Sequence, residues 1–383
     1  MERPKVFLLY SEITPYRLAL FEELSKEVDL QVNFCVSKSR KRFWAASTDG
    51  YSFRSRVLRY VNIGPLIINY LLPFRLVAEH SQLYIIDDDP RLIISKIMTF
   101  IIGKLTNKPV IIWSESIGEA YFGKIKNFIN ANIFSLVNSF IYHNANAFLV
   151  SGQKTADFLI RKGLSKKKIH IGTQGLAESE LKTQMLANKD EIKSQLQVSG
   201  KKIVLFLGYF IKRKGVFELV NAFKRMNRDD SVLIMAGAGK EEGRIKELAA
   251  GDKNISFPGY VDGQEKARYY TIADIFVLPT FVDPWGLVIM EAMMFGLPVI
   301  TTTGAGASEL ILGNGIVIAP GDEEAINESL EYLLDNDEIR EEMGRKSKEI
   351  IKEYTVECAA GTFTEAILHC LNDRKLEGSL SHA

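Results

Sequence analysis

The sequence predicts an α/β protein made of two domains, each with a doubly wound parallel sheet. The chain has 383 residues, a length typical of two domains. Short apolar runs rich in β-branched residues recur along both halves, as expected of strands buried on both faces of a parallel sheet. Longer segments with helical periodicity separate these runs. Strand and helix therefore alternate in the order of a Rossmann-like domain, twice over.

Each half contributes its own set of predicted strands. The first half gives strands at 5–10, 30–36, 83–87, 109–114 and 147–152, and the second at 202–208, 231–237, 254–259, 275–280, 298–302 and 315–319. A loop signature over 172–175 marks the boundary. We therefore predict an N-terminal domain over 1–173 and a C-terminal domain over 174–357. A polar helix over 178–197 follows the boundary. A long charged helix over 323–354 precedes a last helix, about 358–375, that packs back onto the first domain.

The charge is distributed unevenly between the halves. Residues 1–173 carry 24 Lys+Arg against 14 Asp+Glu, and the other residues carry 24 against 33, although the whole chain is only +1. A basic half beside an acidic half suggests either that the halves complement each other or that the basic half meets an anionic partner. Anionic lipid, a phosphate-bearing acceptor and nucleic acid are the possible partners. No nucleic-acid recognition motif supports the last of these.

Other features of the composition limit the function classes. The three cysteines, Cys35, Cys358 and Cys370, are widely spaced, which is against a disulfide scaffold or a structural zinc site. The histidines form no HExxH cluster, so we expect no metal and no required cofactor. The apolar run over 6–10 is too short for a signal peptide, and no apolar run reaches 18 residues. We expect a cytoplasmic protein, with peripheral association at the inner face of a membrane as an option.

Ligands of doubly wound domains bind outside the carboxyl ends of the strands, so the loops there are the first place to look for chemistry. The loop from Gly208 to Gly215 follows a predicted strand and precedes a helix. It carries three successive cations, Lys212, Arg213 and Lys214. Cations are locally unfavourable at a helix N-terminus, so their presence there points to a diphosphate site.

A second loop-to-helix segment carries two carboxylates, Asp283 and Glu291. Gly286 lies between them, where the loop becomes a helix. Glu291 occupies a position about one turn into that helix, where an apolar residue is expected. Carboxylates there are suited to accept hydrogen bonds from a ribose and from a sugar ring. The backbone amides of Gly286, Leu287 and Val288 are suited to a phosphate or sugar oxygen.

These motifs, taken in order, resemble retaining glycosyltransferases of family four, which have the GT-B fold, two Rossmann-like domains facing a cleft. The resemblance covers about 200–355 well and the first half more weakly. It rests on Lys214–Gly215, Ala236–Gly239, Phe257–Val261, Tyr270, Ala273–Asp274, Leu278–Pro279, Asp283–Glu291, Gly304–Gly306, Glu309, Gly315 and Pro320–Asp322.

The resemblance implies roles for individual residues. Lys214, Asp283 and Glu291 become the catalytic residues, with Lys214 on the donor diphosphate, Glu291 on the ribose and Asp283 on the donor sugar. Tyr260 and Val261 meet the base through main-chain atoms. The remaining donor-binding residues are Gly208, Tyr209, Lys212, Arg213, Gly215, Gly237, Trp285, Gly286, Leu287 and Val288. The chain departs from the family at Tyr209, where Arg is usual, and at Asp283, where Glu is usual.

The first half offers fewer signals. Thr14 and Pro15 begin a helix well, with Thr as N-cap and Pro at the first helical position. Arg17 within it faces either the cleft or solvent. Glu115 ends a predicted strand and is the best acceptor-side candidate, together with Arg17. The run Asp87–Pro90 also ends a strand and reads mostly as a capping cluster.

A basic and aromatic segment, Lys38–Trp44, precedes Arg54, Arg56, Arg59 and the apolar stretch Ile63–Phe74. Together they form a possible membrane-facing patch, because basic residues beside apolar ones bind anionic leaflets. Much of the apolar stretch is equally suited to a core.

We therefore expect a retaining, nucleotide-sugar-dependent hexosyltransferase. It moves a sugar from a nucleoside diphosphate to a hydroxyl of a glycan or lipid-linked acceptor, in surface polysaccharide or glycoconjugate biosynthesis. The alternatives are a sugar-nucleotide epimerase of the same fold and a non-catalytic sugar-nucleotide-binding subunit. An NAD(P) oxidoreductase is disfavoured, because residues 10–16 contain no glycine. The sequence leaves the base, the sugar, the acceptor, the linkage and the oligomeric state open.

Overall fold

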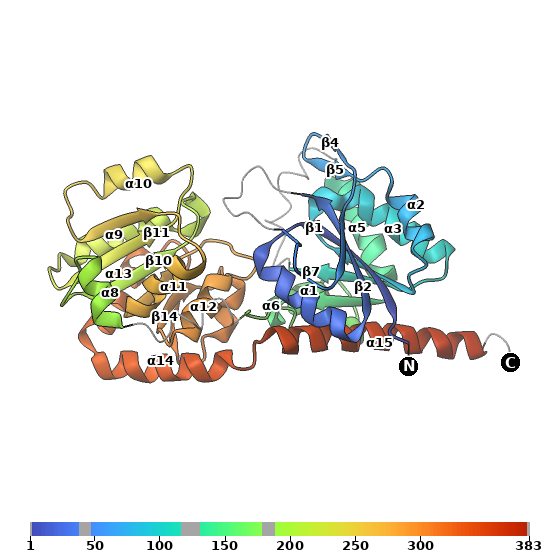
Figure 1. Cartoon of the computed structure of the whole chain (residues 1–383). Coiled ribbons are helices and arrows are strands. Elements are labelled where there is room, and N and C mark those ends of the chain that lie inside the picture. The colour runs from blue at the N-terminus through green and yellow to red at the C-terminus, as the bar shows by residue number, and fades with distance from the viewer. Residues whose placement is uncertain (1, 38–46, 116–130, 178–187, 381–383) are drawn as a thin grey trace. The chain divides into compact units, whose positions relative to one another are not determined.

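The structure, a computed structural model, describes residues 2–37, 47–115, 131–177 and 188–380, with the backbone alone for 131, 132 and 375–380. The chain divides into two compact units. Unit 1 comprises residues 1–175 and 354–383, and unit 2 comprises residues 176–353. Figure 1 shows the elements of both. The basic segment Lys38–Trp44 lies outside the described residues.

Unit 1 contains a seven-stranded sheet in the order β3-β2-β1-β6-β7-β8-β9, and every neighbouring pair is parallel. An antiparallel hairpin, β4–β5, stands apart from it. The strands are β1 (Lys5–Glu12), β2 (Asp29–Val36), β3 (Arg54–Val57), β4 (Val61–Ile63), β5 (Leu66–Ile68), β6 (Leu83–Asp87), β7 (Val110–Ser114), β8 (Ala147–Val150) and β9 (Ile169–Ile171). The sequence did not predict β3, β4, β5 or β9. All four are short, and β3 and β4 are largely exposed, whereas β5 is mostly buried.

Helices cover both faces of this sheet (Figure 1). Alternate residues of β1 face opposite cores: Val6 and Leu8 pack with α1 and α15, whereas Phe7 and Leu9 pack with α2, α3 and α5. This burial on both faces explains why the strands read as continuous apolar runs. The helices are α1 (Pro15–Glu27), α2 (Leu72–Ala78), α3 (Ile93–Leu105), α5 (Ala131–Asn144), α6 (Gln153–Arg161) and α15 (Val356–Leu380), with 3-10 turns η1 (Pro90–Leu92) and η3 (Lys166–Lys168).

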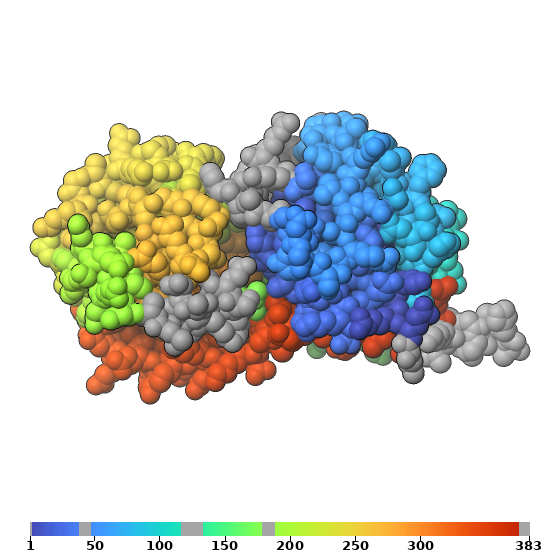
Figure 2. All heavy atoms as spheres, viewed as in Figure 1, coloured from blue at the N-terminus to red at the C-terminus, as the bar shows by residue number. Residues whose placement is uncertain are grey.

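The last helix, α15, returns to the first unit and packs along α1. Phe363, buried in the core of unit 1, meets the ring of Trp113 edge-on with ring centroids 4.9 Å apart. Gly175 allows the chain to pass close to the start of this helix, because a Cβ there would lie 2.4 Å from the Thr355 carbonyl oxygen. Figure 2 shows the red surface of this helix directly beside the blue surface of the N-terminal residues.

Unit 2 contains a six-stranded parallel sheet in the order β12-β11-β10-β13-β14-β15. Its strands are β10 (Lys202–Leu207), β11 (Ser231–Ala236), β12 (Ile255–Gly259), β13 (Ile275–Leu278), β14 (Val299–Thr302) and β15 (Gly315–Ile318). Its helices are α8 (Lys189–Gln195), α9 (Val216–Met226), α10 (Glu242–Leu248), α11 (Gly263–Ile272), α12 (Leu287–Met294), α13 (Glu323–Asp335) and α14 (Asp337–Ile351), with 3-10 turns η4 (Lys212–Lys214) and η5 (Gly306–Leu310).

The predicted single helix over 323–354 is wrong, because the structure has two helices there that break at Asn336. Asn336 has a non-helical backbone (φ −123°, ψ 86°), and its side-chain amide donates to the Tyr332 carbonyl oxygen at 2.7 Å. Asparagine competes for backbone carbonyls in this way. Arg340 then donates to the Leu334 carbonyl oxygen at 3.0 Å, so the carbonyls at the end of α13 are satisfied from α14.

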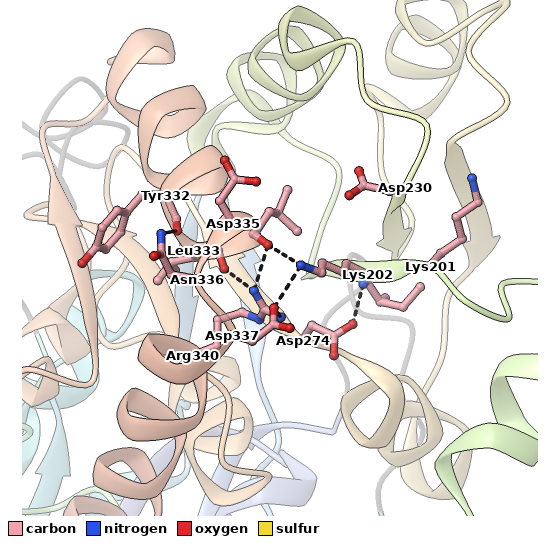
Figure 3. Close-up of polar contacts among 12 residues, drawn as sticks. Lys201, Lys202, Asp230, Asp274, Tyr332, Leu333, Asp335, Asn336, Asp337 and Arg340 are labelled. Atoms are coloured by element: carbon pink, nitrogen blue, oxygen red, sulfur yellow. Dashed lines mark hydrogen bonds and ion pairs between the residues drawn. The ribbon is translucent and has the colours of Figure 1, made fainter.

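A polar network ties this helix break to the first strand of unit 2 (Figure 3). The Lys202 ammonium lies 3.0 Å from the Asp337 carboxylate, which also pairs with Arg340. The Ile203 amide donates to the Asp274 carboxylate at 2.7 Å. Lys202 begins β10, so the network occupies the amino ends of the strands. Ligands of such sheets bind at the opposite ends, so we assign this network to stability.

Candidate functional site

The strand order of unit 2 locates its candidate site. β10 is central, and the chain moves outward from it in one direction through β11 and β12 and in the other through β13, β14 and β15. The crevice at such a switch point, outside the carboxyl ends of the strands, is where doubly wound sheets bind ligands. In this unit the strand order puts the switch point between the loop after β10 and the loop after β13, and we refer to this region as the crevice of unit 2.

Gly215 brings these two loops into contact. It has φ +70°, and a Cβ at this position would lie 2.0 Å from the Pro279 carbonyl oxygen. The Arg213 carbonyl oxygen accepts from the Phe281 amide and from the Thr280 hydroxyl, each at 2.8 Å. A side chain at Gly215 would therefore push apart two loops that hydrogen bonds hold together.

The three predicted cations of the first loop differ in their environment. Lys212 and Arg213 are exposed, and the Arg213 guanidinium donates to the Val282 carbonyl oxygen. Lys214 is buried, and its ammonium group forms an ion pair with the Asp283 carboxylate. The structure thus brings together two residues to which the sequence assigned separate roles. A buried cation at a switch point is suited to an anionic ligand.

Two further glycines fix the loop that carries Asp283. A Cβ on Gly304 would lie 2.2 Å from the Phe281 carbonyl oxygen, and a Cβ on Gly306 would lie 2.2 Å from the Pro284 carbonyl oxygen. The close approach allows three backbone hydrogen bonds of 2.8–3.0 Å between 283–285 and 304–307. Gly286, with φ +99°, then begins α12. The first amides of α12 have no partner within the helix.

Glu291 projects from α12 toward α11, where two residues hold its carboxylate. Lys266 pairs with Oε1 at 2.7 Å, and the Tyr270 hydroxyl donates to Oε2 at 2.8 Å. Burial raises the pKa of Tyr270 well above its ordinary value, and the Glu291 charge raises it further, so this hydroxyl remains a donor. The sequence did not assign Lys266 a role. The sequence did hold one indication of this role: Lys266 and Tyr270 are four residues apart, so they lie on the same face of a helix.

The other predicted donor-side residues lie in unit 2, on the loops that follow its strands or at the start of α12. Gly237 packs closely against Gly208, and a side chain would not fit there, because a Cβ at Gly237 would lie 1.9 Å from the Gly208 carbonyl oxygen. Burial, followed by the Asp262 charge, raises the pKa of Tyr260 to about 12. Trp285 is buried, and its indole N–H donates to the Met290 sulfur at 2.8 Å. The side chains of Leu287, Val288 and Tyr209 are half-buried, and that of Val261 is buried.

In unit 1 the two predicted acceptor-side residues contact each other. Arg17 is fully buried, stacks over Trp113 with its guanidinium carbon 4.8 Å from the ring centroid, and pairs with Glu115. It also donates to the Thr173 carbonyl oxygen at 3.3 Å. Gln174, to which the sequence gave no role, donates to the same Glu115 oxygen at 2.9 Å. Thr14 is the N-cap residue of α1, as predicted, but its side chain makes no cap hydrogen bond.

The run Asp87–Pro90 contains three carboxylates in different environments. Asp89 is a true cap, because its side chain accepts from the Arg91 amide at 2.8 Å. Asp88 is buried and pairs with Lys96, with the Ser114 hydroxyl 2.8 Å from its other oxygen. Asp87 accepts the Ser11 amide at 3.1 Å. Burial, followed by the Asp89 charge, raises the pKa of Asp87 to about 7. The predicted capping role therefore fits Asp89 alone.

Within the described ranges, no group of three His, Cys, Asp or Glu side chains is placed to hold a metal ion. In the same part of the chain, no helix has the length and apolar character needed to cross a bilayer.

Comparison with known proteins shows which family the second unit resembles. Residues 188–350 match the family model described as glycosyl transferases group 1. Over this segment the chain is similar to the group 1 glycosyltransferases. The matched residues contain Lys214, Asp283 and Glu291, and so include the crevice of unit 2.

Curated relatives of this chain occur in archaea and bacteria. An uncharacterized glycosyltransferase of Methanocaldococcus jannaschii is 26% identical over 309 residues, which cover 75% of this chain and 78% of the relative. Phosphatidyl-myo-inositol mannosyltransferase of Mycobacterium leprae is 34% identical over 179 residues, which cover 44% of this chain and 47% of that protein. The chain matches less than half the length of several other curated relatives.

Solved structures show the fold. HepE of Anabaena, crystallised in complex with UDP, superposes with a TM-score of 0.76 at 16% identity, over 95% of this chain and 99% of the HepE chain. With the two parallel sheets, this confirms the predicted GT-B fold class.

Proposed function

We propose that the protein is a retaining glycosyltransferase that uses a nucleoside-diphosphate sugar as donor and a hydroxyl of a glycan or lipid-linked molecule as acceptor. The observation that carries this proposal is the crevice of unit 2. There the buried Lys214–Asp283 ion pair lies between two loops that Gly215 holds in contact, and Glu291 projects from the adjoining helix. The residues of this site are those that the family resemblance assigns to the donor.

The chemistry of the crevice suits a sugar diphosphate. Lys214 supplies a buried positive charge for the diphosphate, and the N-terminus of α12 supplies amides and a partial positive charge. Asp283 and Glu291 supply acceptors for sugar and ribose hydroxyls. The complexes of HepE with UDP and with UDP-glucose support a nucleotide sugar as the ligand class.

In the proposed reaction, the acceptor oxygen forms a bond to the anomeric carbon as the bond from that carbon to the diphosphate oxygen breaks. The electron pair of the broken bond stays on the diphosphate, where Lys214 stabilises the new charge. The hydroxyl proton passes to the departing diphosphate. Retention follows from the resemblance to family four and requires the acceptor to approach from the side of the leaving group.

Unit 1 is the proposed acceptor side. Arg17 and Glu115 lie near the carboxyl ends of its strands, as a ligand-binding role requires. The resemblance to a phosphatidyl-myo-inositol mannosyltransferase favours a lipid-linked acceptor, and with it a place in glycoconjugate biosynthesis. The acceptor hydroxyl would then belong to a molecule with an anionic headgroup.

The first experiment is a thermal-shift screen of UDP, GDP, ADP and their sugar conjugates. A ligand present at about 100 times its Kd adds about 2.7 kcal/mol to the free energy of unfolding, so binding raises Tm visibly. We expect one nucleotide to stabilise the protein and to lose this effect in Glu291→Ala. Lys240→Ala, on the same unit and largely exposed, is the control that keeps it.

The second experiment separates transfer from binding and from epimerisation. The donor found in the screen is incubated with lipid extracts or simple glycosides, and the products are analysed by NMR. A transferred sugar with the donor's anomeric configuration supports the proposal. A C-epimer of the donor, or binding without any release of nucleoside diphosphate, would identify one of the two alternative functions instead.

A further inference from the structure

The Glu291 carboxylate is held by one protein group on each of its oxygen atoms. The Lys266 ammonium group pairs with Oε1 at 2.7 Å, and the Tyr270 hydroxyl donates to Oε2 at 2.8 Å. Both donors belong to α11 and are four residues apart, so they lie on the same face of that helix. The Glu291 side chain is 13% exposed. Its carboxylate is therefore mostly shielded, yet a ligand can still reach it.

The stability of α11 does not explain a lysine at position 266. Lys266 is the fourth residue of the helix and lies in its first turn, where the partial positive charge of the helix N-terminus disfavours a cation. Its side chain is only 20% exposed, so the ammonium group also loses much of its hydration. The desolvation of such a pair offsets much of the attraction between its charges. A role that depends on the orientation of Glu291 accounts for this lysine better than stability does.

Tyr270, the second donor, has a fixed position. It is fully buried, and its ring stacks on the Phe295 ring with centroids 5.3 Å apart and lies 5.9 Å from the centroid of Phe276. Its hydroxyl therefore does not follow a carboxylate that rotates. With a lysine on the other oxygen, the Glu291 carboxylate keeps a single orientation, because a rotation that preserves one of the two bonds breaks the other.

This arrangement leaves each oxygen of Glu291 able to accept one more hydrogen bond. An ionised carboxylate accepts about four hydrogen bonds, two on each oxygen. Among the described residues, Lys266 donates to one oxygen and Tyr270 donates to the other. The remaining positions lie side by side, one on each oxygen. They match two neighbouring hydroxyl groups, such as the 2′ and 3′ hydroxyls of a ribose, with one hydroxyl on each oxygen.

We propose that Lys266 is a positioning residue that, with Tyr270, orients the Glu291 carboxylate toward two neighbouring hydroxyls and so makes the donor site select ribonucleotides over deoxyribonucleotides. The inference rests on the proposed function, in which Glu291 binds the donor ribose. Because the carboxylate is already oriented before the ligand arrives, binding loses less conformational entropy. Lys266 acts through Glu291 and makes no contact of its own with the nucleotide.

The test is titration calorimetry of the full chain with UDP and with 2′,3′-dideoxy-UDP, which lacks both hydroxyls, and with the matching GDP and ADP pairs. We expect the wild type to bind one ribonucleotide at least about tenfold more tightly than its dideoxy analogue, because the analogue loses hydrogen bonds to a charged group. Lys266→Met should weaken binding of that ribonucleotide about twofold to tenfold, the effect of ordering one side chain on binding. Its affinity for the dideoxy analogue should stay at the wild-type value.

Three further variants separate orientation from a structural role. Lys266→Arg keeps a cation beside Oε1 and should restore most of the preference for the ribonucleotide. Tyr270→Phe removes the hydroxyl but keeps the ring, so it should reduce the preference too, and it tests the same point if Lys266→Met does not fold. Arg268→Met removes a cation of the same helix that donates to Gln195 at 2.6 Å, and it should keep the wild-type preference. Thermal unfolding checks that each variant is folded.

The outcomes distinguish this inference from the proposed function. If Lys266→Met lowers the affinity for the ribonucleotide and for its dideoxy analogue by the same factor, the lysine supplies only general charge or stability, and the inference is overturned. Equal binding of the two ligands by the wild type also overturns it, but leaves a nucleotide site in place. No binding of UDP, GDP or ADP by the folded wild type contradicts the proposed function itself, and this inference falls with it.

Discussion

The Lys214 ammonium group and the Asp283 carboxylate form a buried ion pair, although the two residues are 69 positions apart in the chain. Only 11% of each side chain is exposed. Removing both charges from water costs free energy, and the attraction within a buried pair often does not exceed that cost, so a buried pair is weak evidence for a role in stability. Here the pair holds a lysine at the switch point of the sheet, where we propose that it binds an anionic ligand.

Lys214→Met should destabilise the protein, because it leaves the Asp283 charge buried and unpaired. Removal of one partner of a buried pair costs about 3 kcal/mol or more. Lys214→Met with Asp283→Asn should recover most of this loss, because no charge then remains buried. Urea unfolding of the single and double variants measures the coupling. Additive losses would show that the two residues do not interact.

Gly215→Ala should lower the free energy of unfolding by more than the strain of a left-handed backbone alone would. Gly200 provides a matched control, because its φ is +73° and a Cβ there meets nothing within 4 Å. Gly200→Ala should lose about 1–2 kcal/mol, measured by chemical unfolding. Gly215→Ala should lose more and also weaken nucleotide binding, because its Cβ separates the two loops. Equal losses in the two variants would mean that the contact with Pro279 is unimportant.

Glu291→Ala should weaken nucleotide binding at least tenfold, if its carboxylate accepts hydrogen bonds from the ribose, since hydrogen bonds to charged groups contribute about 1.5–3 kcal/mol. Glu265→Ala is the control, because Glu265 is exposed on α11, the helix that contacts Glu291 through Lys266 and Tyr270. Titration calorimetry compares them. A parallel loss in both variants would point to the general charge of this region instead.

The sequence predicted the sheets well because their strands are buried on both faces. Runs such as 202–207 and 231–236 are almost wholly apolar, and their alternation with helices leaves few other folds. It singled out Lys214 and Glu291 because a cation is unfavourable near a helix N-terminus and because an apolar residue is expected at 291. The roles of these two residues and of Asp283 follow from the resemblance to family four and stay predictions. The pairing of Lys214 with Asp283, and of Arg17 with Glu115, was not predictable, because it depends on which loops the strand order brings together.

The shorter features were also missed for physical reasons. β3 and β4 are largely exposed, so they lack the apolar signature of the central strands. The break at Asn336 depends on a side-chain amide that bonds to a carbonyl, an interaction that periodicity does not reveal. The three neighbouring carboxylates Asp87, Asp88 and Asp89 read as one cluster, and only their different burial separates them.

Arg17→Met should lower the stability of unit 1 without changing nucleotide binding. Arg17 is fully buried, and its loss removes the bonds to Glu115 and to the Thr173 carbonyl oxygen, worth about 2–3 kcal/mol. The residues that we propose for donor binding all lie in unit 2, so we expect nucleotide affinity to stay at the wild-type value. Chemical unfolding and calorimetry on the same preparation test both parts. Weaker nucleotide binding in this variant would contradict the division of roles.

Asp87→Asn should stabilise the protein at high pH relative to low pH. The folded-state pKa of Asp87 is raised from 3.8 to about 7, so the fold favours its neutral form. The wild type therefore loses stability as the pH rises through the window from about 4 to 7, whereas the asparagine variant does not. Its Tm relative to the wild type should be higher at pH 8 than at pH 4. A constant difference between the two proteins would show that Asp87 titrates normally.

The most direct measurement is titration calorimetry of the stabilising nucleoside diphosphate into the wild type and into the Lys214→Met, Asp283→Asn double variant. We expect the double variant to keep its fold, because it has no charged pair at the switch point and so leaves no charge buried and unpaired. We predict measurable binding by the wild type and at least tenfold weaker binding by the double variant. No binding of any nucleoside diphosphate by the folded wild type, or equal binding by both proteins, would contradict a donor site at this crevice.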